Sequence, residues 1–326
     1  MTLSCALPPS SRAPEHAAIA ESLGYERVWF YDSPALYHDV WATLARCAHR
    51  TDRIGLGTAV LVPDNRHPLV TASAIATIED LAPGRLTVAI GTGFTGRMAM
   101  GQRALPWSFV RTYVERVRAL LRGEEVEIDG GLCRMIHPAG FAPDRPIQVP
   151  IVIAANGPVG AAVARDLGDG IMTVAGAGNP DFDRCITLVL GTVLDPGESP
   201  TSARAIAAAG PALTVVFHGL YEADPTAVDG LPGGPDWRAR LEAIAEPRRH
   251  LANHEGHLVH VTERDRPVVD GNLLPLFTWT GEAAAIAGRA AAARASGVTE
   301  LMYAPIGPDI ERELRTFRDA ACASTG

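Results

Sequence analysis

The sequence predicts an α/β protein whose strands close into a (β/α)8 TIM barrel, formed by a single domain over residues 1–326. Short apolar runs rich in β-branched residues alternate with longer alanine- and leucine-rich amphipathic runs, about eight times along the chain. Strict alternation of strand and helix indicates a parallel sheet covered by helices. Eight such units in about 300 residues match a TIM barrel. A doubly wound sheet is the alternative, and it differs in a strand order that a sequence does not reveal.

Residues at the ends of the predicted helices and strands support these assignments, in addition to the apolar patterns within them. The first predicted helix has Pro14 near its start and Gly24 at its end, and a hairpin over 124–136 turns at an Asp-Gly-Gly triplet. The predicted strands are 3–7, 27–32, 53–62, one that begins at residue 86, 149–155, 169–176, 212–219 and 299–305. The predicted helices are 14–24, 39–50, 70–82, 107–123, 158–168, 181–194, 281–297 and 308–320.

One segment interrupts the alternation. Residues 218–237 are rich in Pro, Gly and Asp and have no clear periodicity, and mixed material follows. Long irregular segments are uncommon in compact domains and often form lids over a site. We therefore predict an insertion over about 218–280, after the seventh strand, that covers the pocket.

Composition and charge exclude several classes of protein. The net charge of −8 is spread along the chain without a polybasic block, which argues against nucleic acid or an anionic membrane as a partner. Five cysteines lie far apart with no C-x-x-C spacing, as expected for reduced thiols in a cytoplasmic protein. We see no signal peptide and no apolar run of the length of a membrane span.

The stretch LTVAIGTGFTGR, residues 86–97, contains the spacing G-x-G-x-x-G directly after a strand. In a dinucleotide-binding fold the third glycine lies in a helix that starts at once, and an acidic residue follows about 20 residues later. Here Gly101 and Pro106 interrupt the following segment, and residue 111 is Arg. The glycines instead indicate a strand end at which the backbone approaches a flat ligand closely.

Three segments together resemble the bacterial luciferase-like flavin or F420-dependent oxidoreductases, and within them the branch of the methylenetetrahydromethanopterin reductases. These segments are 53–94, 149–174 and 281–305. The resemblance is carried by R-H-P after the third strand, G-R before the fourth and A-x-G-P after the fifth, which are specific in combination. It implies a TIM barrel that holds F420 or FMN at the carboxyl ends of its strands, with F420 preferred, and it implies a homodimer.

The resemblance also implies where the cofactor binds. A non-proline cis peptide often ends the third strand in this family, and the matching bond is Ala59–Val60. The backbone of 156–158 would hold the phosphate at a helix start, because the first N–H groups of a helix lack partners. The residues placed at the cofactor in this way are Ala59, Val60, Thr92, Gly93, Asn156, Gly157, Pro158, Gly176 and Ala177.

Several polar or aromatic residues near the predicted strand ends are candidates for the chemistry. Asp32 either accepts hydrogen bonds from the cofactor ring or anchors a loop. Ser33 stands where related sugar- and pterin-type enzymes often have His, and Phe94 stands where some carry an acid, so the usual proton-transfer pair is missing. His67 is an acid–base candidate by its chemistry, with a loop histidine bonded to the backbone as the favoured alternative.

His254, His257 and His260 do not have the spacing of a metal site, and we predict no metal. The predicted function is hydride transfer from reduced F420, or FMN, to a C=C, C=N or C=O bond of a small substrate. Alternatives are an FMNH2-dependent monooxygenase, a non-catalytic barrel that binds a cofactor or ligand, and a nicotinamide-dependent dehydrogenase that uses the glycine-rich turn.

Overall fold

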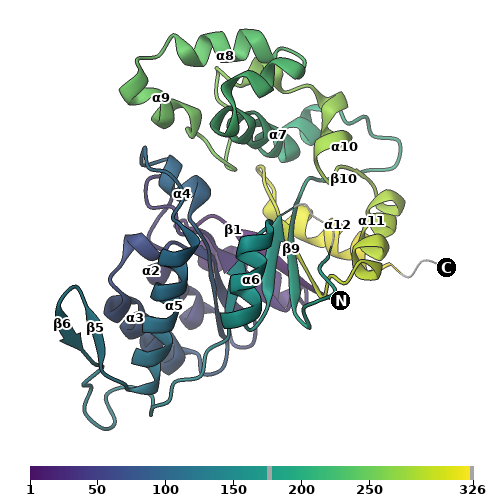
Figure 1. Ribbon diagram of the computed structural model, residues 1–326. Helices are drawn as coiled ribbons and strands as arrows, with labels where there is room; N and C mark the ends of the chain where they lie inside the picture. Colours follow the sequence, from purple (N-terminus) through teal and green to yellow (C-terminus); the bar gives the residue numbers. More distant parts are fainter. Residues whose placement is uncertain (175–177, 324–326) are drawn as a thin grey trace.

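The barrel is closed by eight parallel strands in the order β1-β12-β9-β8-β7-β4-β3-β2, which confirms the predicted fold class (Figure 1). The computed structural model describes residues 1–174 and 178–323. The barrel strands are β1 Thr2–Leu7, β2 Arg27–Phe30, β3 Gly55–Leu61, β4 Leu86–Ile90, β7 Ile151–Ala154, β8 Ile171–Val174, β9 Cys185–Leu190 and β12 Glu300–Ala304.

Helices between successive strands surround this barrel. Several begin at a side-chain cap. Helix α2, for example, begins after Asp39, whose carboxylate accepts from the N–H of Ala42 at 2.9 Å, and its buried residues form an apolar stripe. The surrounding helices are α1 Ala13–Ser22, α2 Val40–Arg50, α3 Pro68–Leu81, α5 Trp107–Arg122, α6 Pro158–Leu167, α11 Ala283–Ala295 and α12 Ile310–Cys322. A hairpin of β5 Val126–Ile128 and β6 Gly131–Cys133 follows α5 as predicted.

Trp29 fills the interior of the barrel and is fully buried. Its indole Nε1 donates to Glu300 Oε1 at 2.9 Å and to Ser4 Oγ at 3.1 Å, so its one polar atom is satisfied. Gly57 is the register partner of Trp29 on the next strand, and a Cβ at that position would lie 2.3 Å from the indole ring. The glycine therefore makes room for the large side chain that packs the barrel.

Two predicted elements are wrong. The predicted helix 181–194 contains strand β9, and the predicted strand 212–219 lies inside helix α7, Ala203–Ala223. A short apolar run that is buried on both faces has no periodicity that separates a strand from a helix. In α7 the run Leu213–Phe217 is rich in β-branched residues but packs into a helical core, and this packing overrides the local preference.

The segment between β9 and α11 lies over one end of the barrel, at the top of Figure 1. The predicted boundary at residue 218 falls inside α7, because the extra segment already begins after β9. It has a core of its own, which includes Phe217, Trp237 and Leu274. Its elements are β10 Val193–Leu194, α7, α8 Gly234–Glu242, α9 Glu246–Asn253, α10 Leu274–Phe277 and β11 Gly281–Glu282, with 3-10 turns at Pro225–Gly230, Arg266–Val268 and Gly271–Leu273.

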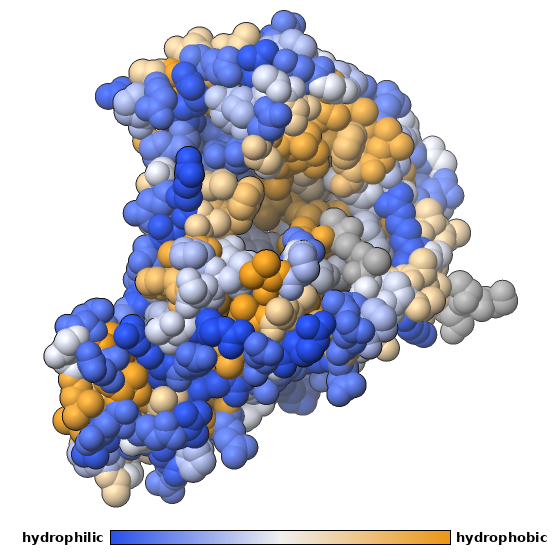
Figure 2. Space-filling model, viewed as in Figure 1, coloured by the Kyte–Doolittle hydropathy of each residue, from blue (hydrophilic) through white to orange (hydrophobic). Residues whose placement is uncertain are grey.

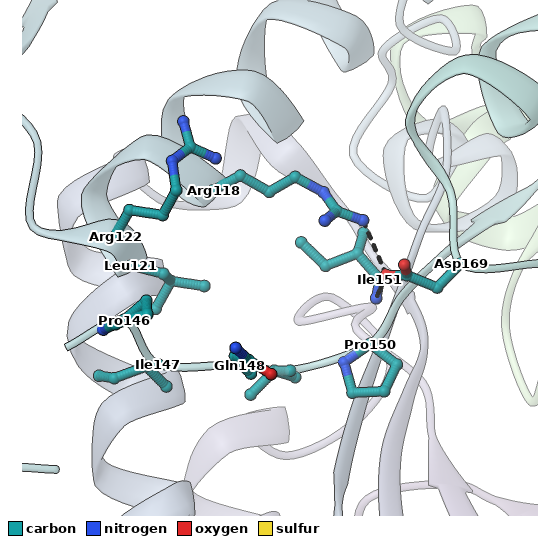
Figure 3. A pocket seen from close by; sticks show the side chains of 10 residues that line it. Arg118, Leu121, Arg122, Pro146, Ile147, Gln148, Pro150, Ile151 and Asp169 are labelled. Carbon is teal, nitrogen blue, oxygen red and sulfur yellow. Dashed lines mark hydrogen bonds and ion pairs between the residues drawn. The ribbon is translucent and has the colours of Figure 1, made fainter. Parts of the chain in front are cut away.

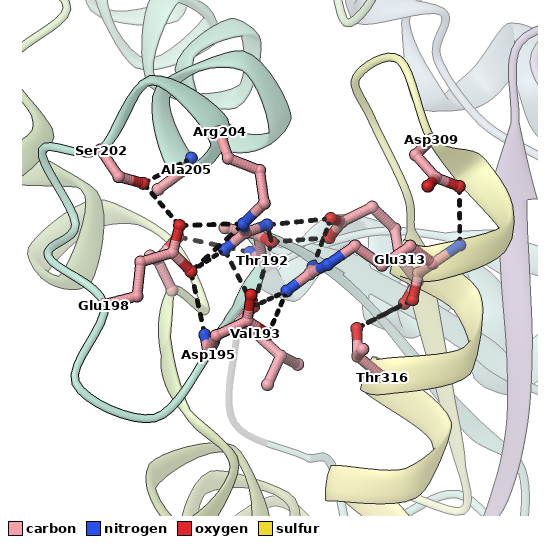
Figure 4. Close-up of polar contacts among 12 residues, drawn as sticks. Thr192, Val193, Asp195, Glu198, Ser202, Arg204, Ala205, Asp309, Glu313 and Thr316 are labelled. Atoms are coloured by element: carbon pink, nitrogen blue, oxygen red, sulfur yellow. Dashed lines mark hydrogen bonds and ion pairs between the residues drawn. The ribbon is translucent and has the colours of Figure 1, made fainter.

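Arg204, in the first turn of α7, ties this segment to the barrel helix α12 (Figure 4). Its guanidinium donates to Thr192 Oγ1 at 3.0 Å and to the buried Glu313 at 3.2 Å, and Thr192 donates to Glu313 at 2.6 Å. Arg204 also donates to Glu198 at 2.9 Å, and these hydrogen bonds lower the pKa of Glu198 to about 2. The base of the segment is thus held by a shared ionic network.

Helix α7 is long and apolar enough to cross a bilayer by length and composition, which corrects the expectation that no such run exists. Its most apolar 18-residue stretch is 56% buried inside the protein. The apolar composition of α7 is therefore that of a helix packed in the protein core.

Candidate functional site

A cavity of about 420 Å³ lies between the carboxyl ends of the barrel strands and the helices above them. Figure 2 shows this region as a hollow with a largely hydrophobic surface. Ligands bind at this end of parallel barrels, because the loops after the strands meet there. The cavity brings together Asp32, Ser33, Ala59, Val60, Thr92, Gly93, Phe94 and Asn156 among the residues singled out from the sequence.

A second groove, of about 570 Å³, lies at the opposite end of the strands (Figure 3). There Asp169 accepts from the N–H of Ile151, the first residue of β7, at 2.8 Å and from Arg118 at 2.7 Å. The carboxylate thus fixes the start of a strand. We assign this groove to the stability face of the barrel.

The cavity has an apolar floor and an apolar roof. Its floor is built by the barrel residues Met172, Leu188 and Met302, and Val215 and Leu258 contribute from the helical segment above. The Ala59–Val60 peptide bond at the end of β3 is cis, as expected, and both residues line the cavity. Such a slot suits a flat, largely apolar ring system.

The three glycines after β4 are explained by close approach of protein atoms. Gly93 has φ +74°, and a Cβ there would lie 2.6 Å from Val62 Cγ1. A Cβ at Gly91 would lie 3.0 Å from Val60, and one at Gly96 would lie 3.1 Å from the backbone oxygen of Asp32. The glycines therefore allow the loop after β4 and a five-residue helix, α4 Phe94–Met98, to pack on the ends of β2 and β3. The sequence reasoning had missed this short helix.

Asp32 anchors the loop after β3. Its buried carboxylate accepts from the N–H of Val62 at 3.1 Å, from Asn65 at 3.2 Å and from Arg66 at 2.8 and 2.9 Å. Arg66 also pairs with Asp39 at 2.6 Å. The loop that Asp32 holds is the one after β3, and Asp32 also lines the cavity.

Asn156 lies between β7 and α6, and its Oδ1 accepts from the N–H of Val174 at 3.1 Å. It lines the cavity, whereas its neighbours Gly157 and Pro158 do not and are exposed at the start of α6. Gly176 and Ala177, expected on the other side of the phosphate, fall outside the described residues.

Trp107 forms part of the cavity wall and packs against α6. A Cβ at Gly160 would lie 2.3 Å from Trp107 Cζ2 and 2.5 Å from Ala155 Cβ. Gly160→Ala is expected to lower the free energy of unfolding by about 1–2 kcal/mol, even after the helical preference of alanine is allowed for. Urea unfolding measures this loss.

The control for that substitution is Gly157→Ala. No atom lies within 4 Å of a Cβ there, and φ is −110°. We expect a change within about 0.5 kcal/mol. Equal losses in the two variants would contradict the packing role assigned to Gly160.

The three catalytic candidates have different surroundings. Ser33 is buried at the cavity, and its carbonyl accepts from the N–H groups of Leu36 and Tyr37. Phe94 is 47% exposed and also lines the cavity. His67 is exposed outside the cavity, where its Nδ1 caps α3 by accepting from the N–H of Leu69 at 3.2 Å. This contact fits the loop-histidine alternative.

His257 is among the cavity residues that the sequence does not predict, since its spacing bears only on a metal site. It lies after α9 and lines the cavity from above, and the hydroxyl of Tyr37 donates to its backbone oxygen at 2.6 Å. Burial raises the pKa of Tyr37 and of Tyr31 beside it, so both phenols stay protonated. Nothing in the local sequence marks His257, because its position depends on how the whole helical segment lies over the barrel.

Within residues 1–174 and 178–323 no three His, Cys, Asp or Glu side chains are arranged to hold a metal ion.

Comparisons with known proteins agree with this picture. A family model described as "Luciferase-like monooxygenase" matches residues 4–209. An F420-dependent glucose-6-phosphate dehydrogenase from Intrasporangium calvum is 31% identical over 224 residues, covering 56% of this chain and 66% of that protein. A 5,10-methylenetetrahydromethanopterin reductase from Methanolobus tindarius is 30% identical over 202 residues, covering 59% of this chain and 58% of that one. The chain thus spans between half and two thirds of the length of such relatives.

Solved structures show the same fold over nearly the whole chain. The F420-dependent tetrahydromethanopterin reductase from Methanopyrus kandleri superposes with a TM-score of 0.66 at 20% identity, covering 98% of this chain and 97% of that one. An F420-dependent secondary alcohol dehydrogenase, solved with an F420–acetone adduct, gives a TM-score of 0.68 at 17% identity, covering 99% of both chains. At sequence identities this low, the similarity shows only that these proteins share the fold.

Proposed function

Because the chain belongs to the luciferase-like monooxygenase family, we propose that it is an F420-dependent oxidoreductase that transfers a hydride to a small organic substrate. The observation that carries the proposal is the apolar cavity at the carboxyl ends of the strands, which includes the cis Ala59–Val60 bond and eight of the residues expected at the site. F420 is preferred to FMN because relatives at 30% identity or more are described as F420-dependent enzymes or as methylenetetrahydromethanopterin reductases.

The residues present fit a deazaflavin. The ring would lie between the Ala59–Val60 bulge and the turn at 92–93, where side chains are small or apolar. The phosphate would bind at the start of α6, a ten-residue helix whose first N–H groups have no partner within the helix. When bound, the cofactor supplies the hydride; the protein orients it against the substrate and excludes water.

The cavity lacks a proton donor at the two positions where related enzymes often carry one. Ser33 and Phe94 hold these positions, and neither titrates near neutral pH. We therefore do not extend sugar dehydrogenation to this chain. A C=O, C=N or C=C bond remains the substrate group that a hydride would reduce.

Titration of the protein with F420 and separately with FMN, followed by fluorescence, tests the proposal. We expect F420 to bind at least tenfold more tightly than FMN, which corresponds to about 1.4 kcal/mol. Gly93→Val is expected to weaken F420 binding, because its Cβ would collide with Val62 and its φ is positive. Gly130→Val, in the remote hairpin at a similar φ, is the matched control for backbone strain.

Each other outcome identifies an alternative. Preference for FMN together with oxygen consumption would favour a monooxygenase, and binding of NADPH alone would favour a nicotinamide-dependent enzyme. Tight F420 binding without turnover of any reducible substrate would favour a non-catalytic barrel. Binding of none of these cofactors would refute the proposal.

We also propose that the protein is a cytoplasmic homodimer without nucleic-acid or membrane partners. The family resemblance supports the dimer, and the free thiols of Cys5, Cys47, Cys133, Cys185 and Cys322 suit a reducing compartment. Sedimentation velocity tests the assembly: a species of 34.5 kDa at micromolar concentration would refute it.

A further inference from the structure

Three histidines of the helical segment are buried together beside the cavity. The rings of His218, His254 and His257 lie 5.9 to 6.3 Å apart, centroid to centroid, and each side chain is at most 6% exposed. His257 lines the cavity, and the other two lie behind it. The cluster is thus in contact with the proposed site at one end.

The other end of the cluster reaches the surface. His254 Nε2 lies 3.3 Å from Glu222 Oε1, and the side chain of Glu222 is 21% exposed. Asn253 donates to the same carboxylate oxygen at 2.9 Å. The nearby ring of His254 is the largest cause that lowers the pKa of Glu222. A carboxylate in contact with solvent therefore stands next to the inner histidines.

The ring nitrogens inside the cluster lack hydrogen-bond partners of acceptable geometry. Both nitrogens of His218, both of His254, and Nδ1 of His257 are buried in this way, while Nε2 of His257 is not among the buried atoms. Buried polar atoms are nearly always satisfied, and several convergent ones indicate an ordered water. Ring centroids 5.9 Å apart suit two imidazoles joined through one water molecule.

His218 is held from its other side. Its Nε2 lies 3.5 Å from Asp265, a buried carboxylate that also accepts from Trp237 Nε1 at 2.8 Å and Thr262 Oγ1 at 2.7 Å. Arg264 lies 3.5 Å from Asp265 and balances its charge. Arg264 also lies 3.8 Å from the exposed carboxylate of Glu255. This side therefore reaches solvent only through a guanidinium, which does not release a proton in proteins, so it fixes a ring orientation and does not carry protons.

We propose that His257, a bridging water, His254 and Glu222 form a relay that carries protons between the active-site cavity and solvent. The proposal rests on the proposed hydride transfer, for which it supplies the missing proton donor. It also assigns the helical segment a chemical role in addition to covering the cavity.

The proton movement balances with hydride transfer to a carbonyl. The carbonyl carbon gains the hydride and a new C–H bond, and the π electron pair moves to oxygen. That oxygen takes the proton from Nε2 of His257, while Nδ1 takes a proton from the water. The water regains one from Nδ1 of His254, while Nε2 of His254 takes a proton that solvent delivers to the Glu222 carboxyl. The substrate gains two electrons with the hydride, for which a C–H bond of the reduced deazaflavin would break. His257 ends neutral with its proton on Nδ1, and exchange with water returns the proton to Nε2 before the next turnover.

Nuclear magnetic resonance of histidine-labelled protein without cofactor tests the relay. We expect cross-peaks between a long-lived water and the ring protons of His254 and His257. We also expect Glu222→Gln to lower the pH at which the cluster takes up its first proton, because a carboxylate that stabilises the protonated cluster is lost. Besides Glu222, the titratable or charged groups that face the cluster are Asp265, Arg264, Tyr37 and His250.

Glu127→Gln, on the exposed hairpin strand β5, is the matched control and should leave both signals unchanged. Absence of the water cross-peaks, or an identical protonation curve in Glu222→Gln, would overturn the relay. Neither signal requires a cofactor. Failure of the relay is therefore distinguishable from failure of the proposed function, which F420 binding reports.

Turnover provides a second readout. With reduced F420 and acetone as the probe, His257→Gln is expected to slow F420 oxidation at least 100-fold, the range lost with a general acid, while the F420 Kd stays within twofold. Added imidazole should restore part of the rate, which a merely structural defect would not allow. A variant as fast as the parent protein would exclude His257 from the proton path.

Discussion

Replacement of Asp32 by Ala is expected to lower the free energy of unfolding by about 3 kcal/mol. The change removes a 3%-exposed carboxylate that neutralises Arg66 and accepts from the N–H of Val62. Loss of one partner of a buried ion pair costs about 3–5 kcal/mol because the remaining charge stays desolvated. The value falls at the lower end since Arg66 keeps its contact with Asp39. Urea unfolding gives the number.

The double variant Asp32→Ala with Arg66→Met is the control for this explanation. It removes both charges, so most of the loss should be recovered, as is found when buried ion pairs are replaced by apolar residues. A double variant that is less stable than Asp32→Ala would show that the loop is held by something other than this pair. F420 binding should weaken in the single variant, because the loop ends at the cavity wall.

Acidification from pH 7 to pH 5 is expected to destabilise the protein strongly. Burial, the largest cause, lowers the pKa of His218 and lowers that of His257 further, whereas both groups regain a pKa near 6.5 on unfolding. Below about pH 6.5 the unfolded chain therefore binds more protons than the folded one. Stability then falls by up to about 1.4 kcal/mol per pH unit for each histidine.

Unfolding midpoints in urea at pH 7, 6 and 5 measure this slope. The double variant His218→Gln with His257→Gln should show a shallower slope, while His49→Gln, exposed on α2, should match the parent protein. Glu222 and Asp265 have lowered pKa values, so their contributions are lost only below about pH 4.5. A free energy of unfolding that stays constant between pH 7 and pH 5 would show that protonation of the two buried rings does not destabilise the folded protein.

Prediction from sequence succeeds where a local pattern decides the structure. The first six barrel strands and the last one are recognised because apolar runs end at Gly, Pro or Asp. Asp32 is singled out by its place at a strand end, whereas the family resemblance points to residues 59–60 and 92–94. All of them line the cavity, and their roles at a cofactor stay predictions. Prediction failed at β9 and α7, where apolar composition fits either structure and the surrounding core decides. The pairing of Asp32 with Arg66 also carries no local signal.

The two ends of the helical segment meet. Val193–Leu194 of β10 pair in parallel with Gly281–Glu282 of β11, so the chain leaves the barrel and returns to it at neighbouring strands, about 5 Å apart. Residues 195–280 thus contribute no strand to the closed barrel. Sequence change in this excursion can reshape the roof of the cavity without moving its floor. Substitutions in this segment can therefore change which substrate the cavity accepts, while the barrel strands that line its floor stay the same.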